Sequence, residues 1–173
     1  DSVTGAVSQD AGSDTFIMSA GTIASLTQGA DIDSAFISGG TITGLFFAGD
    51  NFEFAGGSVG EVNLEVADND MAMWGFTDIV GDLNSENGED EYDLFGGTIG
   101  GTVSTGSADD VVTIGGTQTV FNGVAITPST GATNVSGDVI LEGGSYTVTQ
   151  NAGQISGSGY LDGGPSHTNA QGS

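Results

Sequence analysis

The chain has 173 residues, enough for one domain with its own hydrophobic core. It contains no Lys and no Arg against 23 Asp and Glu, so its formal net charge is −23. Because phosphate neutralisation needs Lys or Arg, this composition argues against nucleic acid and against anionic membrane surfaces as partners. It suits cation binding and an extracellular protein that must stay soluble.

The chain has no Cys, which excludes disulfides and Cys-based metal sites. Its first residues show neither the basic segment nor the apolar core of a signal peptide, and no apolar run approaches membrane-spanning length. Thr4–Val7 followed by Asp14 resembles Thr43–Phe46 followed by Asp50. We therefore expect a mature or excised piece that begins in the middle of a repeat.

A ten-residue motif recurs along the chain. Each copy has an Asp, two core residues at alternate positions, a two-residue turn of small residues, mostly Gly, and another apolar residue. The copies are Asp14–Ile23, Asp33–Ile42, Asp50–Val59 and Asp90–Ile99. Aligned on their turns, at Ala20, Gly39, Gly56, Gly75, Gly96, Gly116 and Gly143, the repeats lie 19, 17, 19, 21, 20 and 27 residues apart.

Two and four residues before each turn, every position is apolar or aromatic, ending with Val139 and Leu141 in the last repeat. A period of two predicts a strand with one buried face. A second strand follows the turn, where Asp78 breaks the apolar column unless Ile79 replaces it by a one-residue slip. We expect a third strand in the remainder, for example at Val62–Leu64, Val80–Leu83 or Val124–Ile126.

Repeats of about 20 residues with this strand and turn content predict a solenoid, because a single repeat cannot bury its apolar face alone. We predict an all-β parallel β-helix of roughly seven to eight coils. Residues 1–162 are expected to form a single domain, as a segment of a longer array. The interval before Gly143 is interpreted as a coil with a protruding loop, and residues 163–173 as a flexible tail or linker.

A column of Asp and Asn precedes the first strand of each repeat: Asp14, Asp33, Asp50, Asn69, Asp90 and Asp110, with Gly137 in the last. Such residues stabilise turns and can bond to the neighbouring coil. The alternative is Ca²⁺, because carboxylates about 4.8 Å apart repel and the chain has no basic residue to relieve them. The nine-residue repeat of known calcium coils is absent. We assign no metal or cofactor residue, and Ca²⁺ stays a possible ligand.

No enzymatic chemistry is predicted. Lyases of the β-helix type use Arg or Lys on acidic sugars, and this chain has neither. A glycosidase needs a carboxylate pair about 5–9.5 Å apart, whereas these acids follow the repeat and not one cleft. The only His, His167, lies in the Gly- and Ser-rich end. We assign no catalytic residue.

Residues 12–29 and 33–50 look like the β-solenoid passenger region of bacterial autotransporters and related large outer-membrane adhesins. The resemblance covers about residues 1–126 well and 135–160 loosely. It implies a right-handed parallel β-helix on a Gram-negative cell surface or in extracellular filaments, anchored in the outer membrane through other regions.

From these observations we expect a structural and adhesive extracellular module, a rigid stalk or fibre segment of a cell-surface adhesin. Its partner would be a protein or glycan of a host or neighbouring cell, and open coil ends could stack on one another. We expect no nucleic-acid partner and no membrane insertion of this segment. The alternatives are a calcium-dependent surface-layer or binding module and a carbohydrate-active β-helix enzyme.

Overall fold

The structure, a computed structural model, describes residues 5–48, 50–64, 66–75, 77–121, 124–131, 133–136, 139–142, 146–150, 153–155, 161–162 and 167–171. These residues form strands, turns and bends, with no helix among them. Accordingly, no helix in the described part is long and apolar enough to cross a membrane.

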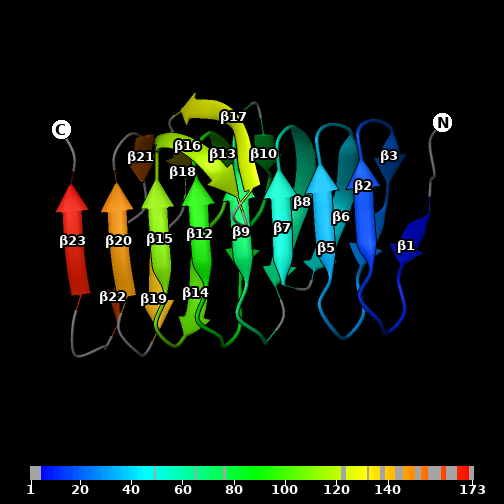
Figure 1. Cartoon of the computed structure of the whole chain (residues 1–173), viewed down its shortest axis with the longest axis horizontal. Helices are drawn as coiled ribbons and strands as arrows, with labels where there is room; N and C mark the ends of the chain where they lie inside the picture. Colours follow the sequence, from blue (N-terminus) through cyan, green and yellow to red (C-terminus); the bar gives the residue numbers. More distant parts are fainter. Residues whose placement is uncertain are drawn as a thin grey trace.

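One wall of the molecule is an eight-stranded sheet, here called the front sheet, which Figure 1 shows face-on. Every neighbouring pair in it is parallel. Its strands, in spatial order, are β2 (Thr15–Met18), β5 (Ser34–Ile37), β7 (Asn51–Phe54), β9 (Asp70–Met73), β12 (Glu91–Leu94), β15 (Val111–Ile114), β20 (Tyr146–Gln150) and β23 (His167–Gln171).

The second and third segments of the coils form a thirteen-stranded parallel sheet, the rear sheet. Two eight-residue strands, β6 (Thr41–Ala48) and β8 (Gly57–Leu64), each span both segments and so join the two rows. The other strands are β1 (Ala6–Ser8), β3 (Thr22–Ile23), β4 (Ser25–Thr27), β10 (Thr77–Ile79), β11 (Leu83–Asn84), β13 (Gly97–Ile99), β14 (Val103–Ser107), β18 (Thr133–Val135), β19 (Val139–Glu142), β21 (Gly153–Ile155) and β22 (Leu161–Asp162).

The predicted parallel β-solenoid is confirmed. Equivalent residues of successive coils lie 17 to 21 residues apart from Asp14 to Asp110. The number of coils differs from the prediction: the regular stack, from β2 to β15, has about five turns where seven to eight were expected. The regular spacing stops at β15 because an insertion follows this strand.

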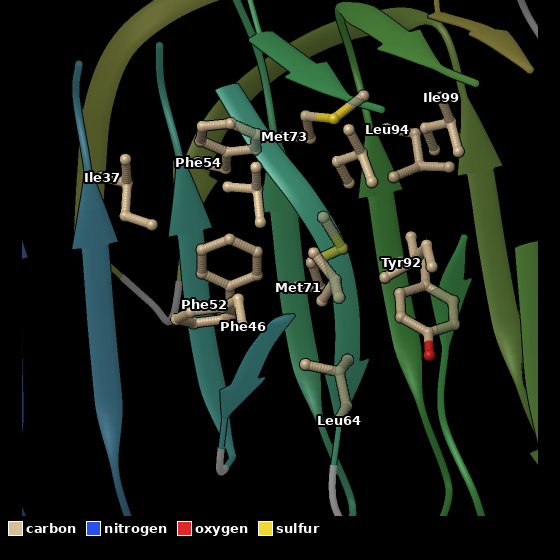
Figure 2. Packing of buried hydrophobic residues seen from close by; sticks show 14 of the residues in the cluster. Ile37, Phe46, Phe52, Phe54, Leu64, Met71, Met73, Tyr92, Leu94 and Ile99 are labelled. Atoms are coloured by element: carbon tan, nitrogen blue, oxygen red, sulfur yellow. The ribbon is translucent and has the colours of Figure 1, made fainter. Parts of the chain in front are cut away.

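The core consists of rows of side chains that run along the stack. Figure 2 shows Ile37, Phe54, Met73 and Leu94 as one row, and each is fully buried. A second row contains Phe52, Met71 and Tyr92, and the ring of Phe46 lies 4.4 Å from that of Phe52 between centroids. These are the columns that the period of two predicts, which confirms the inward face of the first strand.

The expected one-residue slip at Asp78 is confirmed. Ile79 is fully buried and pairs with Val59 and Ile99, while Asp78 is exposed. The third strand is confirmed at two of the three proposed places, because Val62 and Leu83 pair and are both buried. Val80 lies outside a strand and is 60% exposed.

The 27-residue interval was predicted in the wrong register. After β15 the chain makes an antiparallel hairpin, β16 (Gly116–Phe121) and β17 (Val124–Gly131), so Val124–Ile126 belongs to an insertion and not to a coil wall. Val139 pairs with Val103 in the rear sheet, whereas the sequence placed it in the front sheet. The front-sheet strand that follows β15 is β20, in which Thr147 is the residue equivalent to Val111. The predicted turn at Gly143 lies outside the described residues.

The end of the chain contributes a strand. Within residues 163–173, β23 (His167–Gln171) pairs in parallel with β20 over five residues. β1 and β23 lie at opposite ends of the long axis of the molecule (Figure 1). The other residues of the segment interpreted as a tail lie outside the described part.

Candidate functional site

The Asp column of the sequence becomes a hydrogen-bonded ladder along one corner of the solenoid, at the start of each front-sheet strand. In four steps of the ladder a side-chain oxygen accepts the backbone N–H of the equivalent residue in the preceding coil. The amide of Asp14 donates to Asp33 (2.8 Å), that of Asp33 to Asp50 (3.1 Å), that of Asn69 to Asp90 (2.9 Å) and that of Asp90 to Asp110 (3.1 Å). This geometry agrees with the structural interpretation of the column.

The ladder is almost fully buried at Asp33, Asn69, Asp90 and Asp110, each no more than about 1% exposed. The Asn69 amide donates to Asp90 (2.9 Å) and to the Ser85 hydroxyl (3.3 Å), and the Thr105 hydroxyl donates to Asp110 (2.5 Å). Carboxylates in this environment are hydrogen-bonded but lack a basic partner. The corner is therefore a polar network that holds charge without neutralising it.

Burial raises the pKa of Asp90 to about 6, and the neighbouring Asp110 carboxylate adds to the rise, against the lowering effect of the Asn69 hydrogen bonds. Burial also raises the pKa of Asp110, which lies next along the ladder. Burial and the charge of Asp90 raise the pKa of Tyr92 well above its usual value, and the nearby Ser85 hydroxyl opposes this rise. Burial and the neighbouring Asp110 charge therefore shift Asp90 toward its protonated form, and the hydrogen bonds of the network only partly oppose this shift.

Other acids also accept hydrogen bonds from backbone N–H groups of a neighbouring coil. Asp68 accepts the N–H of Glu89 (2.9 Å) and Asp82 accepts that of Thr102 (2.7 Å). In the part of the chain that the structure describes, no group of three or more His, Asp or Glu side chains is arranged to hold a metal ion. The carboxylates of the column are brought into line, one per coil, and not into one coordination shell.

The front sheet carries acids on its outer face that the sequence analysis did not single out as a group. Strand register places Asp70 beside Glu91, and Glu53 and Asp93 on either side of Ala72. Burial raises the pKa of Glu53 and of Asp70, and the Asp68 charge adds to the rise at Asp70. These side chains line up along neighbouring strands and add negative charge to the outer face of β7, β9 and β12.

A recess lies on the same corner as the ladder, and we call it the corner notch. It arises because the step from Asp33 to Asp50 is 17 residues, shorter than the 19 from Asp14 to Asp33. The loops that lead into β5 and β9 extend beyond the start of β7 along the lower edge in Figure 1. The notch has a volume of about 420 Å³ and is lined by Ser13, Ala30, Asp31, Ile32, Asp50, Val66 and Ala67.

The notch combines apolar walls with carboxylates. Ile32 and Val66 are 65% and 60% exposed, whereas the core residues are nearly all below 7%. Asp31 has a φ of 93°, a backbone conformation that favours glycine. Asp50 keeps one oxygen on the amide of Asp33. A ligand there would meet aliphatic surface and negative charge together.

No family model, curated protein or solved structure gives a match to this chain. The resemblance to autotransporter passengers and adhesins thus rests on the repeat pattern, and the family remains part of the proposal below. What the structure shows on its own is a parallel β-solenoid repeat protein with an acidic corner.

Sequence reasoning missed the notch for a physical reason. Asp50 belongs to the predicted Asp column, but Ile32 and Val66 stand outside the apolar columns and gave no signal of their own. The useful signal was the short 17-residue interval, since a short coil between longer ones leaves a recess at its corner. His167 falls in β23, and its side chain lies outside the described part.

Proposed function

We propose that this chain is a structural module of an extracellular adhesin, a rigid stalk or fibre segment. The observation that carries the proposal is the uninterrupted parallel stack from β2 to β15, in which each front-sheet strand pairs with the next through its backbone and the core rows and the Asp ladder run along the same axis. Such a stack resists bending because each coil is bonded to its neighbours along the whole axis.

The ends of the stack support a role in assembly. Among the described strands, β2 pairs only with β5, and β23 only with β20. Unpaired strand edges are templates for further parallel strands, so copies or neighbouring segments can stack end to end. We propose such stacking as the way in which the module joins a longer stalk or fibre.

The composition supports an exposed location, and we propose the bacterial cell surface, with outer-membrane anchoring supplied by regions outside this chain. With no Lys or Arg in 173 residues, the chain offers no site to trypsin-like proteases. Its charge of −23 favours solubility. The proposed partner is a protein or glycan on a host or neighbouring cell.

Stiffness is the property to test. We would express one, two and four copies in tandem and measure the radius of gyration by small-angle X-ray scattering. A rigid stack gives a radius that grows in proportion to copy number, as for a rod, whereas flexibly linked domains grow roughly as the square root. Copies joined by Gly/Ser linkers provide the flexible control. Square-root growth in the directly joined series would contradict the proposal.

A further inference from the structure

The corner notch, formed by Ser13, Ala30, Asp31, Ile32, Asp50, Val66 and Ala67, is a built recess and not a chance cluster of acids. Its two aliphatic walls, Ile32 and Val66, stand on loops of different coils, on either side of the short connection that ends at Asp50. Its carboxylates come from Asp31, beside one wall, and from Asp50. The recess therefore presents two kinds of surface to one occupant.

We propose that the corner notch binds the basic side chain, Lys or Arg, of a partner protein. Such side chains have an aliphatic stem that packs on apolar surface and a cationic head that pairs with carboxylates. Ile32 and Val66 would contact the stem, and Asp31 and Asp50 would pair with the head. The inference rests on the proposed adhesive function and names the chemistry of the partner.

Charge decides between the possible occupants. A second copy of this chain brings no Lys or Arg and the same net charge of −23, so it supplies no cationic head. An apolar ligand would leave Asp31 and Asp50 without a counter-charge, and a bare cation would leave Ile32 and Val66 exposed. A basic side chain of a partner satisfies both parts of the lining.

The first test is a titration of the ¹⁵N-labelled 173-residue chain followed by NMR. The probes are peptides Ac-Gly-Gly-X-Gly-Gly-NH₂ in which X is lysine, diaminopropionic acid or norleucine. Lysine has stem and charge, diaminopropionic acid has the charge without the long stem, and norleucine has the stem without the charge. We expect shifts at Ala30–Ile32 and Val66–Ala67 with lysine, at least threefold weaker binding with diaminopropionic acid, and none with norleucine. Equal affinity for the two charged peptides would overturn the proposal.

The second test changes the walls while the net charge stays constant. Ile32→Ser with Val66→Ser should weaken lysine-peptide binding at least threefold, whereas Val80→Ser, equally exposed on another loop, should leave it unchanged. Asp31→Asn with Asp50→Asn should weaken it about tenfold. The matched control, Glu61→Gln with Glu86→Gln, removes the same charge from exposed positions outside the notch and should have little effect.

These outcomes are separable from those that test the stalk. If peptide binding depends only on total charge, and both pairs of acid variants weaken it equally, the notch is not a binding site. The scattering series would still report on rigidity. Conversely, flexible tandem copies would contradict the stalk while leaving the notch measurements valid.

Discussion

Asp90 is a buried carboxylate whose ionisation is less favourable in the folded protein than in the unfolded chain. It is about 1% exposed, it accepts two hydrogen bonds from Asn69, and the chain has no Lys or Arg to pair with it. Its pKa of about 6 lies above the value of 3.8 for an exposed Asp. The folded state therefore binds the proton more tightly than the unfolded state does.

The pH dependence of stability follows from this difference. The contribution of Asp90 to the free energy of unfolding is fully present below about pH 4 and is lost as the pH rises through about 6. The raised pKa values of Asp70, Asp110 and Glu53 act in the same direction. We expect the melting temperature, measured by circular dichroism, to rise as the pH is lowered from 7 to 5. A melting temperature that falls over this range would contradict the prediction.

Asp90→Asn should raise the free energy of unfolding at pH 7 by about 1–2 kcal/mol and reduce its pH dependence. Asn keeps the oxygen that accepts from Asn69 and removes the buried charge. Urea unfolding at pH 7 and pH 5 measures both effects. Asp14→Asn, at the half-exposed end of the same ladder, is the control and should change little. Destabilisation by Asp90→Asn at pH 7 would show that the charge itself is required.

Gly57 lies in a turn that has no room for a side chain. Its φ is 105°, and a Cβ there would lie 2.5 Å from the carbonyl oxygen of Gly40 in the neighbouring coil. We expect Gly57→Ala to lower the free energy of unfolding by about 1–3 kcal/mol. Gly5→Ala, where nothing lies within 4 Å, should be nearly neutral. Urea titrations of the two variants give the comparison, and equal effects would argue against close stacking of the turns.

At the scale of elements, the hairpin β16–β17 is an insertion into an otherwise regular coil. Ile114 pairs with Leu94, and Thr133 pairs with Gly97, so the chain leaves the stack after the former and rejoins it at the latter. In the coil before, the same two points are joined by Phe95 and Gly96 alone. The backbone positions on both sides of the hairpin are thus already in register.

Deletion of residues 117–132 together with Thr133→Gly should therefore close the coil with a turn like that of the preceding coil. The substitution supplies the glycine that Gly97, with a φ of 89°, provides there. We expect the far-UV circular dichroism per residue to be preserved and melting to remain cooperative. Deletion of 111–126, also sixteen residues, removes β15 and should abolish cooperative melting. Loss of folding in the first deletion would show that the hairpin stabilises the stack.

Alternating apolar residues predicted the strands themselves more reliably than their places in the coil. Phe52 and Phe54 alternate with polar residues on an inward face, and their burial was predicted correctly because strand geometry fixes it locally. Val139 also alternates correctly but belongs to the rear sheet. Alternation indicates a strand and its buried face, but it does not say which wall of the coil the strand joins.

At the scale of the whole molecule, the net charge of −23 has no internal compensation. The acids repeat coil by coil, about 4.8 Å apart along the axis, and they repel one another at distances that salt screens. We expect the melting temperature at pH 7 to rise by several degrees between about 0.05 and 0.5 M NaCl. A constant melting temperature would mean that this repulsion contributes little to stability.

The same melting experiment with Ca²⁺ and with Mg²⁺ distinguishes diffuse counter-ions from a specific calcium site. If divalent ions act as diffuse counter-ions, Ca²⁺ and Mg²⁺ at equal concentration should raise the melting temperature alike. A specific calcium site would give saturable stabilisation at low Ca²⁺ that Mg²⁺ does not reproduce and that EDTA reverses. That second result would favour the calcium-dependent surface-layer or binding module over the stalk.

The class of fold, the inward columns and the column of acids before each first strand can all be inferred from the amino-acid sequence alone. These follow from local rules: a period of two, a turn that needs glycine, and a repeat of about 20 residues that buries its face only by stacking. The tertiary structure decided the register after Ile114, the direction of each ladder bond and the recess between Ile32 and Val66. Those features depend on how coils of unequal length lie against one another, and that relation is not local in the chain.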